Sequence, residues 1–216
     1  MKTKAFLTCG AIAGPLFVVA FLVEGATRAD YDPLCHPVSS LALGDSGWTQ
    51  TANFIVVGLL TLAFAAGLRR ALRPGRGSTW GPLLVGIWAV GLLGAGVFVT
   101  DPVSGYPPGS PDRPSEYSWQ GALHDLFSGP AFVALASACF VFGHRFAAWG
   151  ERRWAVYSIV SGLVFVVGFV LSSAGFGQAA GLVDLAGLFQ RVVVAVGFGW
   201  LTLLAVRLLG DLSPER

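Results

Sequence analysis

Several polar residues of this chain have side chains capable of acid–base chemistry or anion binding. His124 and Asp125 are adjacent, and an imidazole or a carboxyl group can act as a general acid or base. A guanidinium such as that of Arg191 can hold an anionic group or a developing negative charge. The candidate catalytic residues are His124, Asp125 and Asp101. The candidate substrate-binding residues are Arg191, Gln190, Glu24, His36 and Ser39.

Most of these residues are expected at one depth. Glu24 and Asp101 close two long apolar stretches, whereas Asp125 and Arg191 lie about one turn inside two others, each next to a polar neighbour. A charge within an apolar span normally faces the bundle interior and has a partner, so we expect Arg191 to pair with Asp125 or Asp101. Two interpretations stay open. The groups fix helix register, or together they line a polar pocket.

The elements that must position these side chains are six apolar stretches. The chain is 54% hydrophobic and 12% charged, with a mean hydropathy of +0.68. Soluble domains carry about 25% charged residues. Each stretch is near the length of about 20 residues that crosses a hydrocarbon core. We therefore predict an all-α fold, an integral membrane bundle of six transmembrane helices forming one domain over residues 1–216. The predicted spans are about 5–24, 50–68, 80–100, 121–142, 154–173 and 187–207.

The basic residues predict the orientation of the bundle. Eleven of the fourteen Lys and Arg residues fall at the N-terminus or after the second, fourth and sixth spans. They are Lys2, Lys4, Arg69, Arg70, Arg73, Arg76, Arg145, Arg152, Arg153, Arg207 and Arg216. Short cytoplasmic segments carry this excess. We expect a multi-pass cell-membrane protein with cytoplasmic N- and C-termini, whose polar groups gather on the outer side.

Other classes of site have little support. The basic residues are spread over short loops, which does not predict a nucleic-acid partner. His36, His124, Asp101 and Asp125 are suitable metal ligands by type, but their spacing matches no recognised zinc pattern. We predict no metal and no cofactor.

Three short motifs carry a family resemblance. Residues 36–44, His-Pro-Val-Ser-Ser-Leu-Ala-Leu-Gly, precede Trp48 and Asn53, and Asp101-Pro102 and His124-Asp125 follow later. With the six-span layout, these motifs resemble the bacterial membrane proteins called domain of unknown function 998. A more distant similarity is to six-span proteins of the Frag1/DRAM/Sfk1 type, in which an Ile-Ser-x-x-Gly turn precedes the second span. The resemblance implies a six-helix membrane fold and supplies no catalytic residues.

The polar residues and the predicted fold together favour a function at the membrane. The expected partner is a membrane lipid or amphiphilic small molecule, held with its polar end at the charged residues and its tail between helices. The protein would be an enzyme or a binding protein for that molecule. The alternatives are a small-molecule transporter and an accessory protein in which the polar cluster is architectural. The oligomeric state stays open.

Overall fold

Six long helices make up most of the computed structural model, which describes residues 2–75 and 77–212. Each helix is long and apolar enough to cross a membrane, and the described residues form no β-strand, which confirms the predicted all-α six-span fold. Two short 3₁₀ helices, η1 (Val38–Ala42) and η2 (Val183–Leu185), precede α2 and α6. The six long helices are α1 (Lys2–Thr27), α2 (Trp48–Ala71), α3 (Trp80–Val97), α4 (Trp119–Ala148), α5 (Arg152–Phe176) and α6 (Ala186–Asp211).

Most helices extend a few residues beyond the predicted spans at one or both ends. The largest difference is at α4, which continues to Ala148. α3 is the exception, because it ends at Val97 and Phe98 is already extended. Pro102 follows soon after, and the residue before a proline is sterically biased away from helix.

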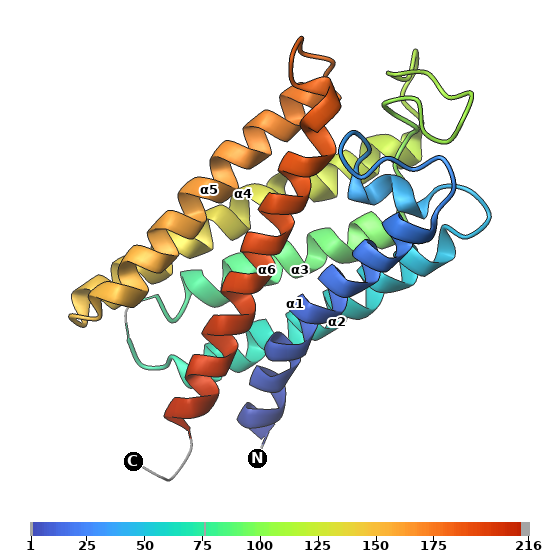
Figure 1. Cartoon of the computed structure of the whole chain (residues 1–216). Coiled ribbons are helices and arrows are strands. Elements are labelled where there is room, and N and C mark those ends of the chain that lie inside the picture. Colours follow the sequence, from blue (N-terminus) through green and yellow to red (C-terminus); the bar gives the residue numbers. More distant parts are fainter. Residues whose placement is uncertain (1, 76, 213–216) are drawn as a thin grey trace.

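The helices form a closed ring. Each one packs against the next along the chain, and α6 returns to pack against α1. Figure 1 shows that the start of α1 and the end of α6 lie at the same end of the bundle, called here the termini end. Small residues allow close packing in the ring. At Gly10 of α1, a Cβ atom would overlap the ring of Phe64 of α2.

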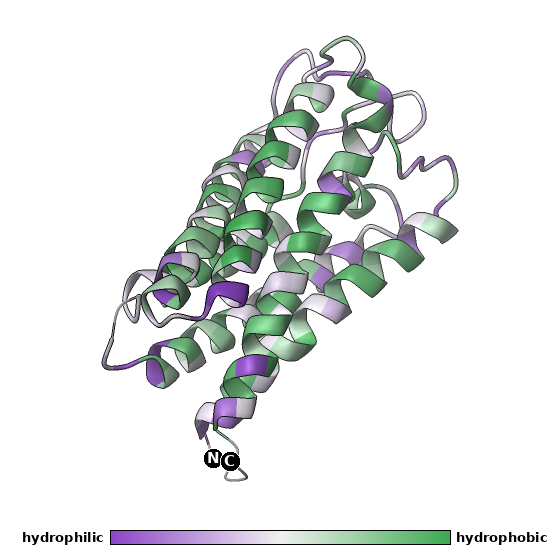
Figure 2. Ribbon diagram, turned by 60° about the vertical axis from the view of Figure 1, so that its left-hand side comes forward, coloured by the Kyte–Doolittle hydropathy of each residue, from purple (hydrophilic) through white to green (hydrophobic). Residues whose placement is uncertain are grey.

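The distribution of hydropathy fits a bundle surrounded by lipid. Figure 2 shows apolar ribbon along the middle of the helices and hydrophilic residues mostly near the ends and in the loops. Large apolar side chains such as Val19, Leu59 and Val133 are exposed on the outer surface of the bundle. In water these side chains would carry a hydrophobic cost, which a hydrocarbon environment removes.

The termini end carries most of the Lys and Arg residues that the structure describes, and its interior is filled by buried side chains. Arg145 is buried near the end of α4, with its guanidinium 3.8 Å from the ring centre of Trp149, and Arg207 of α6 forms an ion pair with Glu151. Trp200 is fully buried in the half of the bundle nearest this end. Two of the basic residues used to predict the orientation, Arg76 and Arg216, lie outside the described residues.

Candidate functional site

A cavity of about 560 Å³ opens at the end of the bundle opposite the termini. Residues from all six long helices line it, together with η1 and the segment between α3 and α4. Its inner part is apolar and largely aromatic, and is lined by Phe17, Phe54, Trp88, Phe132 and Val194. Its entrance is polar, so the lining of the cavity changes from polar at the entrance to apolar at the inner end.

An aromatic layer closes the inner end of the cavity. Trp88, near the middle of α3, lies edge-on to Phe132, with 5.3 Å between ring centres, and edge-on to Phe198, at 5.7 Å. Below this layer the bundle interior is filled by buried side chains, including Leu135 and Phe142. The cavity therefore occupies only the half of the bundle farther from the termini.

His124 lies in the cavity wall near the start of α4 and is buried. Its Nδ1 is 2.8 Å from the carbonyl oxygen of Phe98, just past the end of α3. A carbonyl oxygen can only accept a hydrogen bond, so Nδ1 carries the ring proton and is the hydrogen-bond donor. Nε2 is then the ring nitrogen of the neutral side chain that can accept a hydrogen bond or a proton.

Asp101 lines the cavity and also anchors the start of α4. One of its carboxylate oxygens accepts a hydrogen bond of 2.9 Å from the Ser118 backbone N–H, and the Ser118 hydroxyl in turn accepts one of 2.9 Å from the Gly121 N–H. The carboxylate lies so close to Gly121 that a Cβ atom there would overlap it. A carboxylate at a helix N-terminus is stabilised by the backbone N–H groups and the helix dipole.

Asp125 lines the cavity as well, and its side chain is exposed. It lies one residue after His124, so the two side chains leave the helix in directions about 100° apart. Ser128, one turn further along α4, lines the same wall. The three predicted catalytic residues thus lie on one cavity, although Asp101 is partly engaged in capping α4.

Gln190 and Ser39 are the predicted binding residues that line the cavity. The Gln190 side-chain oxygen accepts a hydrogen bond of 2.7 Å from the Val38 backbone N–H, which fixes η1 against α6. This contact places Ser39 at the entrance. The motif around residue 38 therefore contributes part of the cavity wall.

Arg191 does not line the cavity, and the expected pairing with Asp101 or Asp125 is wrong. Its guanidinium donates hydrogen bonds to the carbonyl oxygens of His36, at 2.9 Å, and Gly187, at 3.0 Å, and to the Tyr31 hydroxyl. The position of a residue along a helix gives the depth of its charge but not the direction of its side chain. Here the segment between α1 and α2 lies over the guanidinium, and its backbone accepts the hydrogen bonds that an aspartate was expected to accept.

His36 also lies outside the cavity lining. Its Nδ1 accepts a hydrogen bond of 2.9 Å from the Asp32 backbone N–H, and its ring packs between Tyr31 and Tyr106. Burial lowers the pKa of His36, although the nearby Asp32 carboxylate opposes this effect. Burial also raises the pKa of Tyr31 to about 12, against the opposing charge of Arg191.

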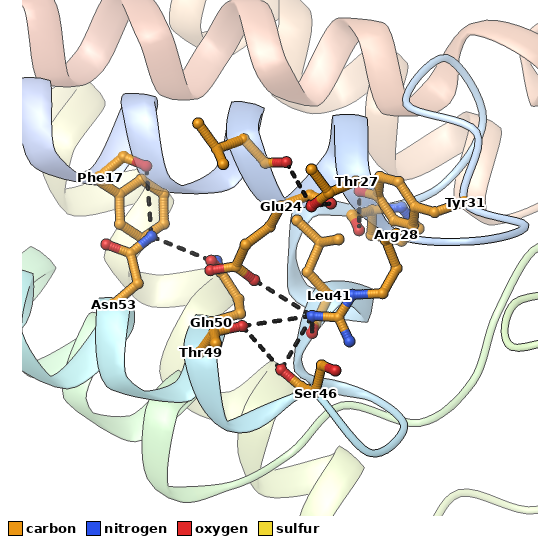
Figure 3. Close-up of polar contacts among 12 residues, drawn as sticks. Phe17, Glu24, Thr27, Arg28, Tyr31, Leu41, Ser46, Thr49, Gln50 and Asn53 are labelled. Atoms are coloured by element: carbon orange, nitrogen blue, oxygen red, sulfur yellow. Dashed lines mark hydrogen bonds and ion pairs between the residues drawn. The ribbon is translucent and has the colours of Figure 1, made fainter.

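Glu24 faces α2 and the segment after α1, not the cavity. Figure 3 shows its carboxylate with the Arg28 guanidinium, at 3.5 Å, which also donates to the carbonyl oxygens of Leu41, at 3.2 Å, and Ser46, at 3.0 Å. Glu24 therefore helps Arg28 to hold the segment that leads to α2. Its predicted contact with a substrate has no support from this placement.

Arg113 and Tyr117 line the cavity but are not among the site residues predicted from the sequence. Both lie in the proline-rich segment between α3 and α4, where no helical period predicts direction. Arg113 was visible as one of the three basic residues outside the orientation pattern, and that was the signal that could have identified it.

The described residues contain no group of three or more His, Cys, Asp or Glu side chains placed to hold a metal ion.

Comparison with known proteins gives the family of the chain. No curated protein and no solved structure matches it. The model of the family described as "Protein of unknown function (DUF998)" matches residues 11–207, which include all the cavity-lining residues. The chain, with its ring of six helices around an amphiphilic cavity, therefore belongs to the DUF998 family.

Proposed function

We propose that this protein binds an amphiphilic, lipid-like molecule in the cavity. The observation that carries this proposal is the change from a polar entrance to an aromatic inner part within the membrane-spanning half-bundle. An aromatic cavity wall favours a hydrocarbon chain, because apolar contact area is gained without desolvating polar groups. A small number of polar groups at the entrance would fix the headgroup.

The entrance chemistry favours a headgroup rich in hydrogen-bond donors. Asp125 presents a carboxylate, and His124 presents Nε2 as an acceptor. Arg191, the residue considered for an anionic group, already donates to backbone oxygens. Arg113 is the guanidinium at the entrance and can meet an acceptor on the same headgroup. A headgroup with hydroxyl or amine donors beside a phosphate or carbonyl would satisfy both sets of residues.

The distribution of basic residues supports an orientation with the termini end in the cytoplasm of a cell-membrane protein. Lys and Arg accumulate at cytoplasmic ends of spans, and Arg70, Arg73, Arg152 and Arg153 lie at the termini end. The entrance then faces away from the cytoplasm. A molecule in the outer leaflet would have direct access to it.

Native mass spectrometry of the protein from gentle detergent tests the binding proposal. Ala95 is buried and lines the cavity, so Ala95→Phe places a ring inside it. Ala52 is exposed on α2 outside the cavity, and Ala52→Phe is the matched control. We expect a co-purifying amphiphile that is lost in Ala95→Phe and retained in Ala52→Phe. An amphiphile retained equally by both variants, or absent from the unmodified protein, would contradict the proposal.

The tautomer of His124 favours a second function, acid–base chemistry on the bound molecule. With Nδ1–H held by Phe98, Nε2 can act as a general base, and Asp125 can serve as a second acid or base. His124→Asn keeps an N–H donor for the Phe98 carbonyl and removes the base. We expect this variant to retain the amphiphile but leave it chemically unchanged, as measured by mass spectrometry of the bound species over time. Identical turnover in both proteins would exclude the enzymatic role.

The packed half of the bundle opposes the transporter alternative. The aromatic layer at Trp88 and the buried side chains below it leave the cavity confined to one half. The accessory alternative predicts instead that no variant of the cavity changes what co-purifies. Uptake by proteoliposomes and the mass-spectrometric comparison separate these alternatives from binding.

A further inference from the structure

The cavity wall between α4 and α5 differs from the rest of the ring. Asp125 and Gly129 of α4 and Phe169 and Ser173 of α5 all line the cavity. Asp125 and Ser173 are exposed to solvent, whereas the cavity residues Leu92 and Ala95 of α3 are buried. The exposed residues mark the α4–α5 side as the more open part of the cavity wall.

The two helices are in close contact nearer the turn that joins them. A Cβ atom at Gly143 of α4 would overlap Ile159, and one at Gly162 of α5 would press against Phe140. Figure 1 shows α4 and α5 close together near their connecting turn and diverging toward the cavity end. The cavity occupies the space between the diverging parts.

The neighbouring seams are closed at the same level. Between α3 and α4, a Cβ atom at Gly94 would overlap the Phe127 ring, and between α5 and α6, one at Gly175 would overlap Ala186. Such contacts leave no room for a chain of carbon atoms between the helices. The opening is therefore specific to the α4–α5 seam among these three.

α4 is unusually open and adaptable at this seam. A Cβ atom at Gly129 would meet nothing within 4 Å. Pro130, the next residue, has no N–H to donate to the Leu126 carbonyl, so α4 lacks one backbone hydrogen bond here. Further inward, the stacked rings of Phe132 and Phe169, with 4.7 Å between centres, join the two helices again and form the inner edge of the opening.

We propose that the α4–α5 seam is a lateral portal through which the hydrocarbon chain of a membrane amphiphile enters the cavity. This inference rests on the proposed function. The headgroup stays near Asp125 and Ser128, and the chain passes over the Phe132–Phe169 edge toward Trp88. Asp125 and Phe132 are separated by about 10 Å along the helix axis, at about 1.5 Å per residue. The polar headgroup therefore contacts the Asp125 side chain, while the hydrocarbon chain contacts the Phe132 ring.

Entry from the membrane avoids the main obstacle to entry from water. Each CH₂ group exposed to water costs about 0.8 kcal/mol, so a long chain leaving the bilayer through the aqueous phase is strongly disfavoured. A chain that moves sideways between α4 and α5 stays in apolar surroundings throughout. The aromatic edge at Phe132 and Phe169 is suited to this contact.

The test uses two photoactivatable probes and the full-length protein in liposomes. The first probe is a long-chain phosphatidylethanolamine with a diazirine at the end of one acyl chain, which resides in the bilayer. The second is a short-chain analogue added from water. Cross-linking to the α3 peptide that contains Trp88 is followed over time by mass spectrometry. The variants are Gly129→Trp and Ser173→Trp, which narrow the seam from opposite sides.

Gly199→Trp is the matched control. Gly199 is a helical glycine of α6 with nothing within 4 Å of a Cβ atom, and it does not line the cavity. We expect Gly129→Trp and Ser173→Trp to slow labelling by the long-chain probe about tenfold more than labelling by the short-chain probe, a difference equivalent to about 1.4 kcal/mol in the barrier. Gly199→Trp should label at the unmodified rate with both probes.

Three results would overturn the portal: an equal effect of the control, equal slowing of both probes, or no slowing at all. Labelling of the unmodified protein by the short-chain probe alone would reject the portal and leave the binding proposal standing. Labelling by neither probe would reject both.

Discussion

Two arginine side chains near the cavity end form hydrogen bonds mainly with the backbone of the segment between α1 and α2. Arg191 binds the carbonyl oxygen of His36, and Arg28 binds those of Leu41 and Ser46. A guanidinium has five N–H donors in a fixed plane and can satisfy several carbonyl groups at once. The two arginines thereby hold the segment that carries Ser39 to the cavity entrance.

We predict that Arg191→Ala lowers the free energy of unfolding by about 2–3 kcal/mol, because hydrogen bonds from a charged donor to partly buried oxygens are lost. The exposed Arg113 provides the control, and Arg113→Ala should change stability by less than about 0.5 kcal/mol. Denaturant unfolding in detergent measures both. Equal stability of the two variants would show that the contacts of Arg191 contribute little.

We also predict that the stability of the folded protein depends on pH through His36. Burial lowers the pKa of His36, while the Asp32 carboxylate raises it and the Arg191 charge lowers it further. The unfolded chain then binds this proton more readily than the folded protein. The contribution of His36 to stability is complete above its unfolded pKa of about 6.5 and decreases as the pH falls below that value. Protonation of Nδ1 also removes the acceptor for the Asp32 N–H.

His36→Asn, which keeps an acceptor but does not titrate, should lose this part of the pH dependence. The measurement is thermal unfolding of both proteins between about pH 8 and pH 5, with the difference between them as the readout. If the unfolding temperatures of the two proteins differed by the same amount at every pH, His36 would not be the source of this pH dependence. Titration of the carboxyl groups common to both proteins cancels in the difference.

At the scale of elements, the start of α4 is held by a residue that also lines the cavity. Ser118 caps the helix, and Asp101 accepts from the Ser118 N–H while lining the cavity. The close approach of Asp101 to the helix requires a residue without a side chain at Gly121. α3 ends at Val97 with Phe98 extended, and Pro102 disfavours a helical conformation at Asp101, the residue before it.

Two alanine substitutions on the same helix test this arrangement. Gly121→Ala should destabilise the protein by about 1 kcal/mol or more, because the new methyl group displaces the Asp101 carboxylate from the helix start. Gly129→Ala meets no other element and should change stability by less than about 1 kcal/mol, because the higher helix propensity of alanine is opposed by contact between its Cβ and the Pro130 ring. Thermal unfolding of both variants checks the difference. A Gly121→Ala protein as stable as Gly129→Ala would contradict it.

At the scale of the whole molecule, the bundle has a hollow half and a filled half. Trp200 is fully buried in the filled half, and Trp88 forms the boundary between the two. Filling one half supplies the close packing that holds helices together in lipid, where hydrophobic association is weak. The other half is then available for a ligand.

Cysteine labelling tests the orientation of these two halves. In a background without Cys9, Cys35 and Cys139, we predict that Asp45→Cys reacts in intact cells with a membrane-impermeant thiol reagent, whereas Arg153→Cys reacts only after permeabilisation. Both positions are exposed, so reactivity reports the side of the membrane. The opposite pattern would place the cavity entrance on the cytoplasmic side.

Hydropathy along the chain was enough to predict the all-α fold and the six helices long enough to span a membrane, because hydropathy over about 20 residues is a local property and a bilayer has a fixed thickness. It also identified His124, Asp125, Asp101, Gln190 and Ser39, which the structure brings to one cavity. Residue type and expected depth pointed to the first four of these, and the motif at residues 36–44 pointed to Ser39.

Which polar side chains face the cavity and which bind backbone oxygens depends on how the helices and loops pack together. Arg191, His36 and Glu24 have the right depth, yet their contacts are with the segment between α1 and α2. The aromatic wall and the opening between α4 and α5 depend on how the helices diverge around the ring. Direction around a helix and the path of a loop are set by contacts between residues far apart in the chain, which local sequence patterns do not encode.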